Sequence, residues 1–213
     1  MNLEYVLPAD IERRSFEIIE SELETEIPLD VKPVIMRAIH TTADFDYAHN
    51  LYFSENVIDI ALAVIDKGAV IVTDTNMARS GINKPALARY GCDCMCFMAD
   101  DDVALAAKEN GTTRATASVD KAATLGKPVI YAVGNAPTAL VRLCEHIIAG
   151  DFVPELVVGA PVGFVNVVQS KEMLIASGIP CIVARGRKGG SNVAAAICNA
   201  LLYMLDNKKG FKK

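Results

Sequence analysis

The chain has 213 residues, of which 52% are hydrophobic and 22% charged, and its formal net charge is −5. A chain of this size and composition can bury a large core, so we expect a single domain over residues 1–213. The acidic balance argues against broad binding to nucleic acid or to acidic membranes. No apolar run approaches the roughly 20 residues of a membrane span, and the start Met1-Asn2-Leu3-Glu4 lacks the pattern of an export signal. These features predict a cytoplasmic protein without a membrane partner.

The first part of the chain is predicted to be helical. A stripe of apolar residues over 11–23 predicts a first helix, and a second helix is expected over 31–39, ending near His40. Ser54 is expected to be the N-cap of a third helix that runs through Asp66.

From residue 70 onward, short apolar segments alternate with segments of helical length. Strands are expected over 70–72, 92–98, 129–133, 156–159 and 181–184. Helices are expected over 102–110, 115–125, 137–149, 165–177 and 191–205, followed by a frayed basic tail over 208–213. Continuous apolar strands separated by helices predict a doubly wound α/β fold, with a mainly parallel sheet and helices on both faces.

The six cysteines do not suggest a disulfide framework. Cys92, Cys94 and Cys96 alternate along one expected strand, and the other three occur singly among apolar residues. No Cys-x-x-Cys pair or histidine cluster completes a set of metal ligands. We therefore expect buried, apolar cysteines and no metal site.

In a doubly wound fold, ligands bind where the parallel strands end. The loops expected at that edge span residues 73–77, 134–138, 159–163 and 186–191. The last loop is rich in glycine and lies beside the basic residues Arg185, Arg187 and Lys188, so free N–H groups of the following helix could hold an anion there. Tight turns with a solvated basic rim explain the same residues equally well, and both interpretations remain open at this stage.

His40 is the best candidate for a general acid among only three histidines. At the carboxyl end of a helix, the helix dipole favours a protonated ring, which suits a proton donor. A histidine that only caps the helix fits the local sequence as well. His49 and His146 are predicted to be structural or exposed. The chain has no Gly-x-Ser-x-Gly elbow, dinucleotide fingerprint or P-loop, which disfavours hydrolases and nucleotide-dependent enzymes.

Five segments taken together resemble the precorrin-8 methylmutase family. They are Arg37-Ala38-Ile39-His40, 134–140, 161–165, Ser170-Lys171-Glu172 and 186–191. Their order and spacing also match, and the likeness extends from about Arg14 to the helix around Asn199. The resemblance implies an isomerase of cobalamin biosynthesis that moves a methyl group from C-11 to C-12 of a corrinoid ring, giving hydrogenobyrinate or cobyrinate. It also implies a homodimer with active sites at the subunit interface, and no organic cofactor.

The resemblance further implies that His40 is the catalytic residue, as proton donor or acceptor to the macrocycle. By the same matching, Ser15, Arg37 and Arg114 contact the substrate, with Arg114 assigned to either subunit. The neighbourhood of His40 and the strand-end loops add further expected substrate contacts, namely Thr42, Asp74, Met77, Asn135, Pro137, Thr138, Gly163 and Lys188.

These expectations agree with the chemistry of the implied substrate. A corrinoid carries acetate and propionate side chains, which call for helix N-termini and basic residues around a broad apolar cleft. A methyl shift within a conjugated ring needs no nucleophile, which fits the lack of a catalytic triad. The main alternative is a carrier that binds the product corrinoid without turnover, and the sequence leaves the metal state of the substrate open.

Overall fold

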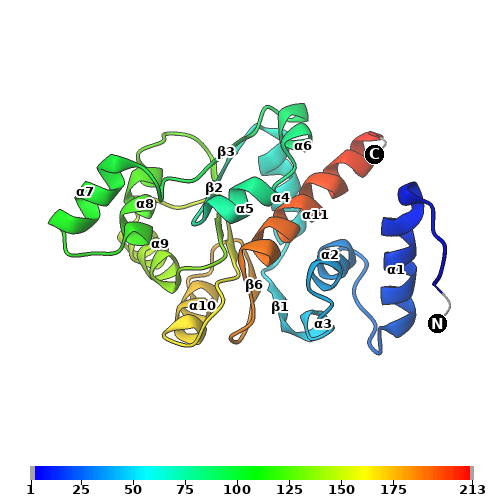
Figure 1. Cartoon of the computed structure of the whole chain (residues 1–213). Coiled ribbons are helices and arrows are strands. Elements are labelled where there is room, and N and C mark those ends of the chain that lie inside the picture. Colours follow the sequence, from blue (N-terminus) through cyan, green and yellow to red (C-terminus); the bar gives the residue numbers. More distant parts are fainter. Residues whose placement is uncertain (1–2, 212–213) are drawn as a thin grey trace.

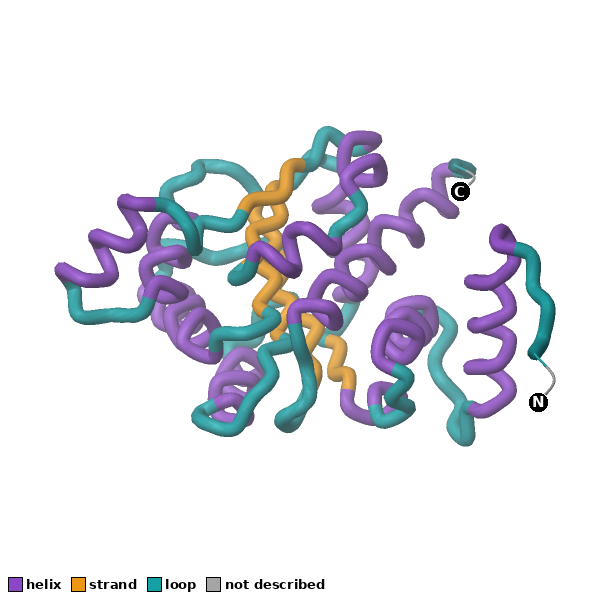
Figure 2. The backbone as a smooth tube through the Cα atoms, in the orientation of Figure 1, coloured by secondary structure: helices purple, strands orange, loops and turns teal. Residues whose placement is uncertain are grey.

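The computed structural model describes residues 3–211 and contains a six-stranded sheet in the order β1-β6-β5-β4-β2-β3. The strands are β1 (Leu51–Phe53), β2 (Val70–Thr73), β3 (Asp93–Met95), β4 (Val129–Val133), β5 (Leu156–Gly159) and β6 (Cys181–Ala184). Only β1 runs antiparallel, beside β6, and all other neighbouring strands are parallel. The sheet lies in the middle of the molecule with helices on both sides (Figure 2), which confirms the predicted doubly wound fold.

One face of the sheet is covered by helices from both ends of the chain. They are α2 (Lys32–Thr42), α4 (Val57–Asp66) and α11 (Ser191–Lys209), with α5 (Asn76–Gly81) and α6 (Lys84–Arg89) packed at the end of this layer. α1 (Ile11–Glu22), preceded by a short 3-10 turn (Pro8–Asp10), packs on the outside of α2 (Figure 1). Residues such as Ile71, Ile130 and Ile182 turn their side chains into this layer.

The opposite face is covered by four consecutive helices. These are α7 (Asp101–Glu109), α8 (Arg114–Ala123), α9 (Pro137–Ala149) and α10 (Val167–Ala176), and α3 (Tyr47–Asn50) leads into β1. Every residue of β4, β5 and β6 is buried because helices cover both faces. This explains why these strands are apolar without alternation.

The strand register brings the carboxyl ends of four parallel strands to one edge of the sheet. Thr73 pairs with Ala132, Val133 pairs with Gly159, and Gly159 pairs with Val183. The loops that follow β2, β4, β5 and β6 therefore start side by side. This edge is called the carboxyl edge below.

Several predicted boundaries are wrong. Ser54 is not a helix cap, because its hydroxyl accepts the N–H of Cys181 at 2.9 Å, and α4 begins after Asn56. The predicted end of the second helix near His40 is close to the observed one, because α2 ends at Thr42 and His40 lies within its last turn. β3 covers only residues 93–95 of the predicted strand over 92–98.

The tail expected to be frayed over 208–213 is helical at its start. α11 extends to Lys209, whose ammonium lies 2.8 Å from a carboxylate oxygen of Asp66, and Gly210 closes the helix with a φ of 78°. The ion pair and the left-handed cap explain the extra turn. Residues 212–213 of the predicted tail lie outside the described residues.

Between residues 3 and 211, no helix is both long and apolar enough to cross a membrane. All six cysteines are free, and only Cys94 is not fully buried.

Candidate active site

The structure places the expected site residues in two groups. The first group lies at the carboxyl edge and contains Asp74, Met77, Arg114, Asn135, Pro137, Thr138, Gly163 and Lys188. The second lies on α1 and α2 and contains Ser15, Arg37, His40 and Thr42.

Asp74 shapes the loop after β4. Its side chain is 1% exposed, and its carboxylate accepts the N–H groups of Gly134, Asn135 and Ala136 at 2.7–2.8 Å. Burial raises the pKa of Asp74 above its ordinary value, and the three N–H donors act in the opposite direction. The carboxylate thus holds the turn that carries Asn135, while the side chain of Asn135 remains exposed.

Two glycines allow the loops at the carboxyl edge to interlock. A Cβ atom at Gly134 would lie 2.6 Å from Cα of Ser191, and one at Gly189 would lie 2.2 Å from the carbonyl oxygen of Ala160. Only glycine permits such close approaches of backbone. The hydroxyls of Thr75 and Ser191 lie 2.7 Å apart, which also joins the loop after β2 to the start of α11.

The start of α9 brings Arg114 to the same edge. Pro137 is the first residue of α9, and the hydroxyl of Thr138 lies 3.0 Å from that of Thr113. Thr113 is the N-cap of α8 and accepts the N–H of Thr116 at 3.1 Å. Arg114 follows directly and is exposed, so its guanidinium is free to reach a ligand at this edge.

Exposed apolar side chains border the carboxyl edge. Met77, Phe164 and Val165 are 73%, 82% and 78% exposed, and the guanidinium of Arg187 lies 5.5 Å from the ring centroid of Phe164. Exposed apolar surface with basic groups on its border suits a flat apolar ligand that carries acidic substituents.

Lys171 is a residue of this region for which the sequence predicted no role. It is fully buried, and its ammonium donates to the carbonyl oxygens of Gly186 at 2.9 Å and Lys188 at 2.8 Å. Burial lowers the pKa of Lys171 to about 8. A signal was present, because Lys171 is spaced with Val167 and Leu174 on the buried stripe of α10, where a lysine is unusual.

His40 lies in the second group, on an open surface. Its side chain is exposed in the last turn of α2, and its ring centroid lies 5.2 Å from that of Phe16. His40 borders a groove of about 330 Å³ between α1 and the end of α2, which Ser15 also lines. Within residues 3–211 the imidazole has no hydrogen-bond partner, so both ring nitrogens are available to a ligand. The hydroxyl of Ser15 donates to the carbonyl of Ile11 at 2.8 Å.

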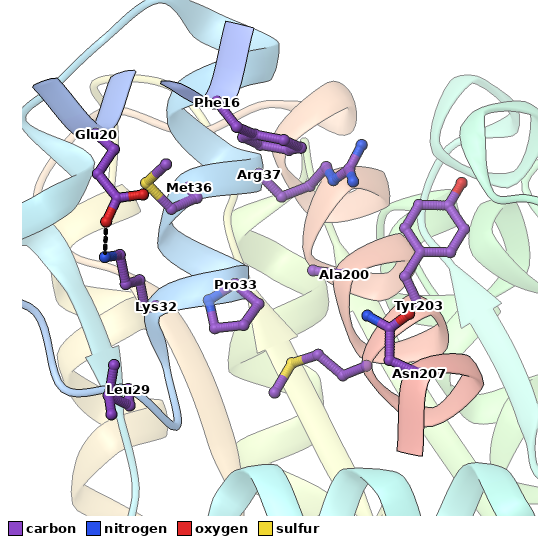
Figure 3. Close-up of a pocket in the computed structure, with 11 residues that line it drawn as sticks. Phe16, Glu20, Leu29, Lys32, Pro33, Met36, Arg37, Ala200, Tyr203 and Asn207 are labelled. Carbon is purple, nitrogen blue, oxygen red and sulfur yellow. Dashed lines mark hydrogen bonds and ion pairs between the residues drawn. The ribbon is translucent and has the colours of Figure 1, made fainter. Parts of the chain in front are cut away.

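Arg37 is held by protein groups one turn earlier in α2. Its guanidinium pairs with Glu12 and lies between two rings, 4.9 Å from the centroid of Phe16 and 5.0 Å from that of Tyr203. It lines a cavity of about 340 Å³ between α1, α2 and α11 (Figure 3). These contacts fasten α1 to the rest of the layer.

Lys188 joins the two groups. Its ammonium lies 2.6 Å from a carboxylate oxygen of Asp44 and 2.5 Å from one of Asp46, in the turn after α2. Hydrogen bonding to these carboxylates raises the pKa of Lys188 above its ordinary value, and Lys188 lowers the pKa of Asp44. Thr42 supports the same turn, because its hydroxyl donates to Ala38 at 2.7 Å and accepts the N–H of Asp44 at 3.2 Å.

Over the described part of the chain, no three His, Cys, Asp or Glu side chains gather in a way that could hold a metal ion. The two groups of residues together offer basic side chains, backbone N–H groups, an apolar border and one open imidazole. These groups can bind a polyacid and exchange a proton with it.

Comparison with known proteins identifies the family. Residues 10–204 match the family described as precorrin-8X methylmutase. A cobalt-precorrin-8 methylmutase of Salmonella typhimurium is 47% identical over 206 residues, which cover 93% of this chain and 96% of that relative. A precorrin-8X methylmutase of Pseudomonas aeruginosa is 37% identical, with 90% and 93% covered. The crystal structure of precorrin-8x methyl mutase from Thermus thermophilus matches with a TM-score of 0.86 and 37% identity, covering 93% of this chain and 98% of that one. The chain belongs to the precorrin-8X methylmutase family.

Proposed function

We propose that this protein is an isomerase of cobalamin biosynthesis that moves the methyl group at C-11 of a corrinoid ring to C-12. The observation that carries the proposal is the open imidazole of His40 in the last turn of α2, in a chain that matches the methylmutase family over residues 10–204. A rearrangement within one molecule requires a correctly held tautomer and a proton donor, and neither a nucleophile nor an electron carrier.

Cobalt-precorrin-8 is the proposed substrate, with cobyrinate as its product. Relatives named cobalt-precorrin-8 methylmutases are 36–47% identical to this chain, and the relative at 47% carries this name; two relatives named precorrin-8X methylmutases are 37% and 32% identical. Cobalt enters here as part of the substrate.

His40 is proposed to give a proton to the macrocycle or take one from it. An imidazole ring can both donate and accept a proton, which suits this role. Arg114, Asn135 and Thr138 are proposed to bind the acidic side chains, and Met77 to contact the apolar ring. Lys188, which pairs with Asp44, and Gly163, whose N–H donates to the carbonyl of Arg187 at 3.2 Å, are proposed to hold the loop after β6 in place.

For site residues that are already engaged with protein groups, we propose a supporting role. Asp74 holds the loop of Asn135 in place, and Arg37 fastens α1 beside His40. Thr42 supports the turn that meets Lys188, and Pro137 sets the first turn of α9.

A homodimer with active sites between subunits is also proposed. His40 and Ser15 border an open groove, and Leu3, Tyr5 and Leu29 around α1 are 91%, 89% and 84% exposed. Exposed apolar side chains of this size commonly mark protein interfaces. Sedimentation equilibrium checks the proposal, since a mass of one chain at micromolar concentration would contradict it.

The six free cysteines support a location in the reducing cytoplasm, which cell fractionation would test.

The function is tested by incubating the purified protein with precorrin-8 and, separately, with cobalt-precorrin-8 while recording the visible spectrum. We expect a small amount of protein to convert an excess of cobalt-precorrin-8, so that the visible spectrum shows the change of ring conjugation for all of the substrate. A spectrum that shifts only in proportion to bound protein, without turnover, would support the carrier instead.

A further inference from the structure

The ammonium of Lys171 is buried without an acidic partner. Among the described residues its only hydrogen-bond acceptors are the backbone carbonyls of Gly186 and Lys188, at 2.9 and 2.8 Å. Burying a charge is costly unless strong interactions offset the loss of hydration. A methionine of similar length would fill the same space without that cost, so packing alone does not explain a lysine at position 171.

The two hydrogen bonds fix two peptide planes in the loop after β6. In a trans peptide the C=O and N–H groups point in opposite directions, and the described chain has no cis peptide bond. Because the carbonyl of Gly186 points at Lys171, the N–H of Arg187 points away from it. The carbonyl of Lys188 likewise turns the N–H of Gly189 away. Within residues 3–211 neither N–H group has a protein acceptor.

The rest of the loop is held tightly around these two peptides. The N–H of Gly163 donates to the carbonyl of Arg187 at 3.2 Å, and the N–H of Gly190 donates to that of Ala160 at 2.8 Å. Gly189 packs so closely against Ala160 that an added Cβ atom would lie 2.2 Å from the carbonyl oxygen of Ala160. Backbone N–H groups that have no protein acceptor are suited to bind an anion.

The charge of Lys171 also differs from the charges of Arg185 and Lys188. Arg185 pairs with Glu172 at 2.6 Å, and Lys188 pairs with Asp44 and Asp46. Those cations are balanced locally by carboxylates. The ammonium of Lys171 has only carbonyl dipoles around it, so its field is available to an anion placed on the other side of the loop.

We propose that Lys171 is a positioning residue that draws the carbonyls of Gly186 and Lys188 inward and so aims the N–H groups of Arg187 and Gly189 at a carboxylate of the corrinoid. Lys171 does not touch the ligand. The inference rests on the proposed function for the identity of the ligand, and it assigns one carboxylate-binding position within that site.

The test compares the affinity of two ligands for three proteins. Wild type, Lys171→Met and the control Lys209→Met are titrated with cobyrinate and with fully methyl-esterified cobyrinate, and binding is followed by absorbance. Lys209 is a suitable control because it lies at the far end of α11 and its replacement removes the same charge. We expect Lys171→Met to bind cobyrinate about tenfold to a hundredfold more weakly, as for a lost charge-assisted hydrogen bond, and to bind the ester as wild type does.

Unchanged affinity of Lys171→Met for cobyrinate would overturn the proposal. So would an equal loss for both ligands, because that result means a general distortion of the cleft. Binding of the ester at wild-type strength also shows that the variant is folded.

A second measurement on the wild-type protein does not depend on any variant. The amide resonances of Arg187 and Gly189 are expected to shift when cobyrinate is added and to stay in place with the ester. Absence of a shift with cobyrinate overturns the proposal even where Lys171→Met fails to fold. Wild-type protein that binds cobyrinate in this way but never converts cobalt-precorrin-8 would refute the isomerase and leave the assignment of Lys171 intact.

Discussion

The ammonium of Lys188 lies 2.6 Å from a carboxylate oxygen of Asp44, which ties the glycine-rich loop after β6 to the turn after α2. This turn directly follows the helical turn that carries His40. The ion pair therefore connects the proposed proton donor to the edge of the sheet where the loops are proposed to bind the substrate.

This connection predicts an acid-sensitive contribution to stability. Lys188 lowers the pKa of Asp44 below its ordinary value of 3.8, so the pair stabilises the fold above about pH 4 and the contribution disappears as the pH falls through the lowered pKa. We expect the stability difference between wild type and Lys188→Met, measured by urea unfolding, to shrink from pH 6 to pH 3. A difference that stays constant over this range would contradict the role of the pair.

Replacement of His40 separates catalysis from binding. His40→Ala removes the exposed imidazole but leaves the loops at the carboxyl edge intact, so we expect turnover to fall by about 100-fold to 10,000-fold with little change in product affinity. His49→Ala is a matched control, because His49 is also exposed and lies just beyond the turn after α2. Wild-type turnover by His40→Ala would refute the proton role.

The close approach of Gly134 to Ser191 predicts a large loss of stability on substitution. The added Cβ of Gly134→Ala would lie 2.6 Å from backbone Cα, so the loop or the start of α11 must move, at a cost of about 3 kcal/mol or more. Gly111→Ala serves as the control, because a Cβ there meets nothing within 4 Å and only its φ of 61° is unfavourable, at about 1–2 kcal/mol. Equal losses in thermal unfolding would mean that the loops are free to separate.

Lys171 predicts a second rise of stability with pH, in the alkaline range rather than the acidic range of Asp44. Burial lowers its pKa to about 8 from 10.5, so the unfolded chain binds one more proton than the folded protein between these values. Stability relative to Lys171→Met should therefore rise from pH 8 to pH 10.5, by up to about 3 kcal/mol. The neutral amine still has two N–H groups for its two carbonyls, so the loop stays in place. Parallel urea midpoints for the two proteins would show that Lys171 titrates normally.

Much of the sheet could be predicted because most of its strands are short apolar segments that stand out from the sequence on either side. The bounds of β4, β5, β6 and α9 agree with the apolar segments that predicted them. β1 was missed because three residues become a strand only by pairing with β6, far along the chain. The bond from Cys181 N–H to Ser54 has the same long-range character, and it overrides the local capping preference of serine.

The candidate site residues were chosen from the sequence, but their arrangement could not be predicted from it. His40 was singled out by its place near the end of a helix, and the structure keeps it in the last turn of α2. The engagement of Asp74 with backbone N–H groups depends on a loop some 60 residues away, which no local pattern reveals. The contacts of Lys171 with Gly186 and Lys188 also arise only when α10 packs beneath the loop.

The most direct test of the central claim follows the methyl group itself. Cobalt-precorrin-8 labelled with ¹³C in the methyl group at C-11 is incubated with the protein, and the product is examined by ¹³C NMR. The account predicts that the labelled methyl appears at C-12 with wild-type protein and remains at C-11 with His40→Ala. A label that stays at C-11 with the wild-type protein, although the ligand is bound, would contradict the account.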